Sequence, residues 1–165
     1  MERGDIFCVK KDSLFAKAIL WVQARSSRDG KAQYSHTGII VDEDGSTLEA
    51  LSTIRFENVF ENCSGYQVII GRNREMTDEA FHCGLEAVQD QIGKWYPWWR
   101  LFAHLIPSVA IHSNVSKRLT CAALGCKFLW GGKLLGYYEG MNPDKVADMM
   151  IEFKNWDIIY EGRLP

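Results

Sequence analysis

The sequence predicts an α+β protein, in which a mostly antiparallel sheet packs against helices. Three observations lead to this fold class. The segments occur in the order strand, helix, several strands, a series of helices and a closing strand. Asp44-Gly45 separates two apolar runs, which is a strong hairpin signal. The later helices begin at residues that are typical N-caps. At 165 residues the chain is expected to form one domain, residues 1–165, large enough to bury roughly two thirds of its unfolded surface.

The strands are predicted from short runs rich in β-branched and aromatic residues. The segment 36–41, HTGIIV, and the segment 46–51, STLEAL, flank the Asp44-Gly45 turn. The other strands are expected at 4–9, 53–59, 66–72 and 156–162.

Two amphipathic helices are predicted before residue 93. The first covers 12–25, with Asp12 as N-cap and with Leu14, Ala18, Trp21 and Val22 at helical spacing. The second covers 77–92 and starts at Thr77; its apolar positions form one stripe at Phe81, Leu85, Val88 and Ile92.

Two further helices are predicted in the last third of the chain. Residues 120–130 are apolar nearly all round, so this helix is expected to be central and buried, and Gly131-Gly132 ends it. Asn142 as cap and Pro143 at the first helical position start the next helix, at 142–153.

The charge balance and hydropathy exclude several classes of protein. With 19 basic and 21 acidic residues the formal net charge is −2, which does not favour a nucleic-acid-binding protein held by bulk electrostatics. Apolar runs fall short of the roughly 18 residues of a membrane span. Charged residues interrupt the N-terminus before any apolar core develops, so no signal peptide is predicted and the cytoplasm is the default compartment.

The five cysteines do not form a disulfide framework, since their number is odd and their spacing irregular. Cys63, His82 and Cys83 are conceivable zinc ligands, but adjacent ligands such as His82 and Cys83 suit a structural zinc site poorly. The sequence therefore predicts no metal and no cofactor.

His36 and Glu49 are the unexpected residues of the predicted hairpin. Alternation places His36 on the same face of its strand as Gly38 and Ile40. With a two-residue turn, Glu49 points to this face but lies some four residues along the ladder from His36; a longer turn over 42–45 brings the pair closer. Taken alone, a histidine at a strand start is more often a hydrogen-bonded structural residue.

Cys121 follows Thr120 at the start of the predicted buried helix. Free backbone N–H groups and the positive end of the helix dipole favour a thiolate at this position. Taken alone, a cysteine in TCAAL is more often a small core residue. Cys126, deeper in the same helix, is the better candidate for an inert core thiol.

Together these residues occur in a recognisable order. The succession GDIF, YSHTGIIV, LEAL and TCAAL resembles the permuted papain-like amidases of the YaeF/YiiX type, which are NlpC-type proteins related to lecithin retinol acyltransferase. The resemblance runs from residue 3 to about residue 160. It implies a permuted papain-like fold with the nucleophile at a helix N-terminus.

The resemblance also implies roles for individual residues. Cys121 would be the nucleophile, His36 the base that takes its proton, and Glu49 the group that orients His36. A thiol nucleophile needs such an adjacent base, and the base needs a third group to fix its tautomer. Tyr34 would add a wall or a donor to the site. Trp98 and Trp99 belong to the aromatic segment 94–107 and are predicted to contact the substrate if that segment forms a hydrophobic wall over the cleft.

The implied reaction is cleavage of an amide bond, in a peptide or a peptidoglycan-like fragment, through a thioester acyl-enzyme. Two alternatives stay open: a lipid acyltransferase or thioesterase with the same triad, and an inactive binding module. The aromatic segment 94–107 fits a helix packed onto the core or a partner, a wall over the cleft, or a lipid-contacting patch. The sequence does not predict an oligomeric state.

Overall fold

The computed structural model describes residues 1–27, 30–95, 119–136 and 140–165. Within these residues the chain folds as predicted into an α+β structure around one antiparallel sheet, whose strand order is β4-β3-β2-β1-β5-β6. The strands are β1 Ile6–Lys10, β2 His36–Ile40, β3 Ser46–Ala50, β4 Ile54–Asn58, β5 Gln67–Asn73 and β6 Trp156–Arg163. All six correspond to predicted strands.

The described helices are α1 Leu14–Ser26, α2 Val59–Asn62, α3 Asp78–Gln89, α6 Cys121–Gly131 and α7 Pro143–Glu152. The side-chain hydroxyls of Thr77 and Thr120 accept hydrogen bonds from the first turns of α3 and α6. Asn142 caps α7, with Pro143 in its first turn. These three helix starts confirm the sequence prediction, because each depends on a local capping pattern. Among the described residues, no helix has the length and apolar character needed to cross a membrane.

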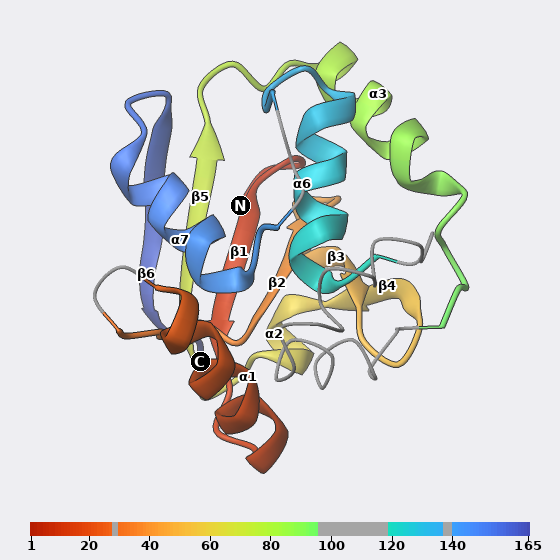
Figure 1. Cartoon of the computed structure of the whole chain (residues 1–165). Coiled ribbons are helices and arrows are strands. Elements are labelled where there is room, and N and C mark those ends of the chain that lie inside the picture. Colours follow the sequence, from red (N-terminus) through yellow and green to blue (C-terminus); the bar gives the residue numbers. More distant parts are fainter. Residues whose placement is uncertain (28–29, 96–118, 137–139) are drawn as a thin grey trace.

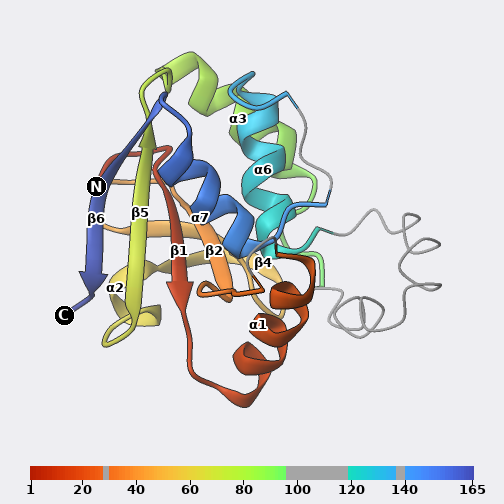
Figure 2. The same cartoon turned by 60° about the vertical axis from the view of Figure 1, so that its left-hand side comes forward.

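The sheet has a different cover on each face. Helices α3, α6 and α7 pack on one face, where they form the main hydrophobic core with side chains such as Ile6, Ile39 and Ile69 (Figure 1). The other face carries a smaller core that includes Phe7, Ile40 and, from α2, Val59. Figure 2 shows the helical layer beside the sheet from a second direction.

Helices α3 and α6 pack closely because small residues lie between them. A Cβ on Gly84 would be 2.7 Å from the ring of Phe128, so only glycine fits there without displacing that ring. Helix α6 is buried along most of its length, as its apolar sequence predicts. Of the predicted α3 stripe, Phe81 and Val88 are buried, but Ile92 lies beyond the helix and is 39% exposed.

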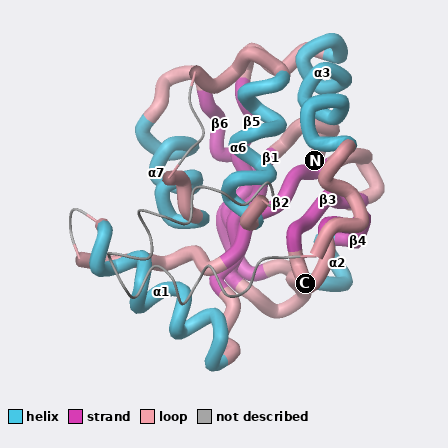
Figure 3. Tube along the Cα trace, turned by 45° about the vertical axis from the view of Figure 1, so that its right-hand side comes forward, coloured by secondary structure: helices cyan, strands magenta, loops and turns pink. Residues whose placement is uncertain are grey.

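Helix α1 departs from the prediction at its start and in its orientation. Ser13, not Asp12, is the N-cap: its hydroxyl accepts a hydrogen bond from the N–H of Ala16. The predicted apolar stripe does not face the core, since Leu14 is 86% and Trp21 is 52% exposed. Helix α1 lies beyond the end of β1, apart from the layer of α3, α6 and α7 (Figure 3), so no sheet is available to cover that face.

The short helix α2 was not predicted. Residues 53–59 were expected to continue as a strand, but β4 ends at Asn58, whose side chain accepts a hydrogen bond from the N–H of Phe60 and so starts a helical turn. An asparagine cap ends the strand here because it offers the backbone a partner outside the ladder.

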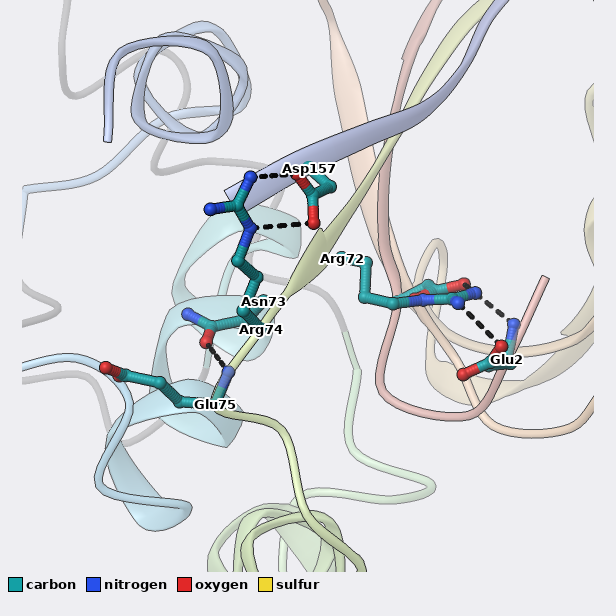
Figure 4. Close-up of polar contacts among 7 residues, drawn as sticks. Glu2, Arg72, Asn73, Arg74, Glu75 and Asp157 are labelled. Carbon is teal, nitrogen blue, oxygen red and sulfur yellow. Dashed lines mark hydrogen bonds and ion pairs between the residues drawn. The ribbon is translucent and has the colours of Figure 1, made fainter. Parts of the chain in front are cut away.

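The ends of β5 and β6 are joined by a polar cluster (Figure 4). Arg72 forms a two-pronged contact with Asp5, at 2.8 and 3.0 Å, and also contacts Glu2. Arg74 pairs with Asp157 of β6. These ion pairs connect β1, β5 and β6 at their shared end.

Candidate active site

The hairpin of β2 and β3 brings His36 and Glu49 together. Gly38 lies opposite Glu49, and the N–H of Val41 donates to the carbonyl of Ser46, so the turn covers residues 42–45. This is the longer of the two turns considered from the sequence. Glu49 is therefore displaced from His36 by only two residues of the ladder, on the same face.

The carboxylate of Glu49 contacts His36 directly. Its Oε2 is 2.7 Å from Nε2 of His36, and its Oε1 accepts a 2.7 Å hydrogen bond from the hydroxyl of Thr47. Glu49 is completely buried and His36 is 8% exposed. A buried carboxylate with both oxygens engaged has little freedom to turn, so it holds the imidazole ring in one orientation.

Gly38 makes the contact between His36 and Glu49 possible. A Cβ at this position would lie 2.5 Å from the ring of Phe7 and 2.9 Å from Cγ of Glu49. Phe7 occupies this space and meets the His36 ring edge-on, with 6.3 Å between the ring centres. A glycine is needed here because the carboxylate side chain and the aromatic ring both pass over the backbone of β2.

Cys121 reaches the same imidazole from the helical layer. It is the first residue of α6, and its thiol lies close enough to the side chain of His36 for each to shift the pKa of the other. The backbone N–H groups of Thr37 and Ala122 also point to its sulfur. Since Nε2 of His36 contacts Glu49, Nδ1 is the nitrogen left for Cys121. Residues 85 positions apart thus form one chain of contacts, from Cys121 through His36 to Glu49.

The electrostatic surroundings of Cys121 and His36 favour the thiolate–imidazolium form of this pair. Burial is the largest influence on His36 and lowers its pKa, but Cys121 and Glu49 together outweigh it and raise the pKa to about 9. Burial also opposes ionisation of Cys121, yet the pKa of this thiol is lowered by His36 and by the N–H groups of Thr37 and Ala122. The pKa of Glu49 is lowered as well: burial raises it, but the contacts to His36 and Thr47 prevail. The thiolate and imidazolium forms stabilise each other.

The other thiols have different surroundings. Burial raises the pKa of Cys63 and of Cys126 to about 12 and also raises that of Cys8. Cys63 is fully buried, whereas Cys83 is exposed. All five cysteines are free, as expected from their spacing.

A cavity of about 390 Å³ lies next to Cys121 and His36. Its walls come from the β1–α1 connection, α1, the start of β2, the end of β3 and Trp95. The lining residues are Lys11, Ser13, Phe15, Ala16, Ile19, Ser35, His36, Ala50, Leu51, Ser52, Trp95 and Cys121. None of these residues is acidic, and most of the wall is apolar. The cavity thus gives an apolar group of a ligand access to the thiol.

Tyr34, which was expected to contact substrate, is not among the described residues of this wall. Tyr34 is 6% exposed and packs in the main core; burial, followed by the charges of Glu161 and Cys8, raises its pKa to about 12. Trp98 and Trp99 lie outside the described residues, as does all of the segment 94–107 beyond Trp95. Trp95 lines the cavity and is held there by a bridge to Thr53.

Sequence reasoning missed two parts of the site. Thr47 lies two positions before Glu49 on the same face of β3, so strand alternation contains the signal for it. The contribution of α1, through Phe15 and Ile19, has no sequence signal, because it depends on where the helix lies relative to β2.

The donor atoms of the site do not form a metal centre. Cys121 and one nitrogen of His36 are neighbours, but Glu49 contacts the other nitrogen, on the far side of the ring. A zinc site normally has at least three protein ligands around one point. Among the residues that the structure describes, no group of three histidine, cysteine or acidic side chains has such a geometry.

Comparison with known proteins relates the chain by structure alone. No family model matches the sequence, and no curated protein matches it. Among solved structures, the metalloprotein yiiX from Escherichia coli O157:H7 is similar, with a TM-score of 0.64 over 98% of both chains and 14% sequence identity. The chain therefore shares the fold of yiiX. At this identity the likeness concerns the fold and not the activity.

Proposed function

We propose that the protein is a cysteine hydrolase that cleaves an amide bond through a thioester acyl-enzyme. The observation that carries this proposal is the continuous contact chain from Cys121 to His36 and Glu49, with the thiol at the positive end of α6. An inert binding module has no need for a thiol whose pKa is lowered beside an imidazole whose pKa is raised. The yiiX-like fold, and the order of the motifs that resembles permuted papain-like amidases, are consistent with this proposal.

The residues have defined roles in this reaction. The thiolate of Cys121 attacks the carbonyl carbon of the amide, and the N–H of Cys121 is a candidate donor to the oxygen that becomes negative. The imidazolium of His36 then gives its proton to the leaving amine as the C–N bond breaks, and the thioester remains. His36 next takes a proton from water, whose oxygen attacks the thioester. The C–S bond then breaks, which releases the carboxylic acid and restores the Cys121 thiolate beside the His36 imidazolium. Glu49 stabilises the imidazolium throughout.

The printed name of yiiX describes it as a metalloprotein. Of the residues that the structure describes, those around Cys121 supply only two neighbouring donors and so do not fit a metal. The proposed reaction therefore contains no step through a metal ion.

A second candidate is hydrolysis or transfer of a lipid acyl ester or thioester. The apolar wall formed by Phe15, Ile19 and Leu51 favours it, because such a wall suits an acyl chain better than a polar glycan peptide. The acyl-enzyme would be the same, so the two candidates differ in substrate and not in the role of Cys121.

Thiol reactivity tests the proposal before any substrate is known. Brief treatment with limiting iodoacetamide at about pH 6 should label Cys121 first among the five cysteines, because only the thiolate reacts and the pKa of Cys121 is lowered. The variant His36→Ala should slow this labelling by at least about tenfold, since it removes the partner cation. Peptide mapping by mass spectrometry gives both results. Faster labelling of the exposed Cys83, or unchanged labelling in His36→Ala, would contradict the proposal.

Substrate panels then separate the two candidates. A set of peptide amides and a set of acyl esters and acyl thioesters should be compared, with release of the acid as the readout. Turnover of amides supports the first candidate, and turnover restricted to esters or thioesters of long acyl chains supports the second. In either case the acyl group should be trapped as a mass increase on the Cys121 peptide.

A further inference from the structure

We propose that the exposed face of α1 docks the protein on a lipid surface that carries anionic headgroups. This face consists of Leu14, Lys17, Ala18, Trp21 and Arg25, together with the adjoining Phe15. The docking itself does not depend on the proposed catalytic activity.

The face is apolar where a water-soluble helix would be polar. Leu14 is 86%, Phe15 49% and Trp21 52% exposed. Leu14, Ala18 and Trp21 follow one another at intervals of four and three residues, so they lie along one side of the helix. Such a row on a surface helix indicates a contact with another apolar phase.

The polar groups around this row are basic. Lys10, Lys17 and Arg25 are exposed, and none of them forms an ion pair with a residue that the structure describes. Four basic residues and one acidic residue give residues 10–27 a formal charge of +3, whereas the whole chain carries −2. The remainder of the protein is thus acidic, and this helix is the part that an anionic surface attracts.

The side chains of Trp21 and Arg25 are arranged for an interface. The guanidinium carbon of Arg25 lies 3.5 Å from the centre of the Trp21 ring. This cation–π pair keeps an aromatic body and a positive charge side by side, which suits the boundary between acyl chains and headgroups. A second copy of the chain that paired through the same face would set these cations against their own counterparts, and an apolar partner protein would leave them unmatched.

The docking face continues into the cavity of the candidate active site. Phe15 belongs to both, and Ser13, Ala16 and Ile19 of the same helix region line the cavity. Since Phe15 is half exposed, a molecule that contacts this side of α1 lies next to one wall of the cavity. The proposal concerns α1 itself and assigns no role to residues 96–118.

Vesicle flotation with the intact chain tests this proposal. The probes are phosphatidylcholine vesicles with and without about 30% phosphatidylglycerol. All proteins should carry Cys121→Ala, so that the result is independent of the activity under "Proposed function". The parent protein should float with the anionic vesicles, bind the neutral ones at least tenfold more weakly, and be released as salt is raised.

Two variants and a control identify the surface. The double variant Leu14→Glu/Trp21→Glu should weaken vesicle binding by at least tenfold. The double variant Lys17→Glu/Arg25→Glu should weaken binding to anionic vesicles only. Ile151→Glu, a matched change at a 59% exposed position on α7, should bind like the parent. Circular dichroism should confirm that each variant is folded.

The proposal is overturned if the parent binds neither type of vesicle, or if the α1 variants and Ile151→Glu bind alike. Sedimentation analysis provides a further check. The parent could self-associate without binding vesicles, and the double variant Leu14→Glu/Trp21→Glu could abolish that self-association. This result would identify a second copy of the chain as the occupant and would also overturn the proposal.

Discussion

Helices α1 and α6 both border the candidate active-site cavity and both have apolar sequences, but they meet opposite environments. Helix α6 lies between the sheet and α3, and Leu124, Cys126 and Phe128 are fully buried. Helix α1 lies beyond the end of the sheet, and among its described side chains only Ala16 and Gln23 are buried. The comparison shows that an apolar helix is buried only where the fold provides a surface to cover it.

The difference also separates two tasks within the site. The first residue of α6, Cys121, interacts with His36 and with the backbone N–H groups of Thr37 and Ala122. Helix α1 contributes wall residues that remain partly exposed, such as Phe15. Chemistry that needs fixed geometry is thus located on the buried helix, and contact with larger molecules is left to the exposed one.

The largest expected effect is the loss of activity when the nucleophile is replaced. This change tests whether α6 serves catalysis as well as packing. Cys121→Ala should lower kcat/KM by at least about 10⁴-fold, or ~5.5 kcal/mol of transition-state stabilisation, while the fold is retained. Cys126→Ala is the matched control in the same helix: it should keep activity and lose only a little stability, since its thiol is a small core group. Equal loss of activity in both variants would indicate that α6 affects the site only through packing.

The next largest effect is on stability, and it compares α6 with α1 by replacing one leucine in each helix. Leu124→Ala, at a position with no exposure, should lower the free energy of unfolding by about 2–5 kcal/mol because it leaves a cavity. Leu14→Ala, at 86% exposure, should change it by less than about 0.5 kcal/mol. Urea unfolding followed by circular dichroism measures both. A destabilisation of 2 kcal/mol or more from Leu14→Ala would show that this face is covered within the monomer.

The smallest effect concerns the group that orients His36. Glu49→Gln keeps the shape of the side chain but removes its charge, so it should lower kcat/KM by about 10- to 100-fold, or ~1.4–2.7 kcal/mol. Full activity in this variant would leave Glu49 as a structural residue.

The pH profile distinguishes orientation from simple damage. Activity of the wild type should fall as the pH rises through about 9, because His36 then loses the proton that it gives to the leaving group. In Glu49→Gln this alkaline limb should move to lower pH, since the carboxylate that raises the pKa of His36 is gone. An unmoved limb with reduced activity would mean that Glu49 acts only through packing.

Local sequence patterns predicted most of the elements. The six strands, the caps at Thr77, Thr120 and Asn142 and the burial of α6 all depend on residues close together in the chain. Strand parity also predicted that His36 and Glu49 share a face, and the longer turn considered for the hairpin is the one observed. The pairing of Cys121 with His36 was expected only from the order of motifs, because no local rule relates residues so far apart.

The sequence by itself determined where the six strands lie and where α3, α6 and α7 begin, because capping, alternation and helical spacing are short-range properties of the chain. It did not determine which way α1 faces: its apolar spacing is that of a buried helix, and only the position of the sheet leaves Leu14 and Trp21 uncovered. Nor did it determine that Gly38 leaves room for Glu49 beneath Phe7, or that Phe15 and Ile19 line a cavity at Cys121. These features depend on distances between elements, and such distances are set by how the helices and the sheet pack together.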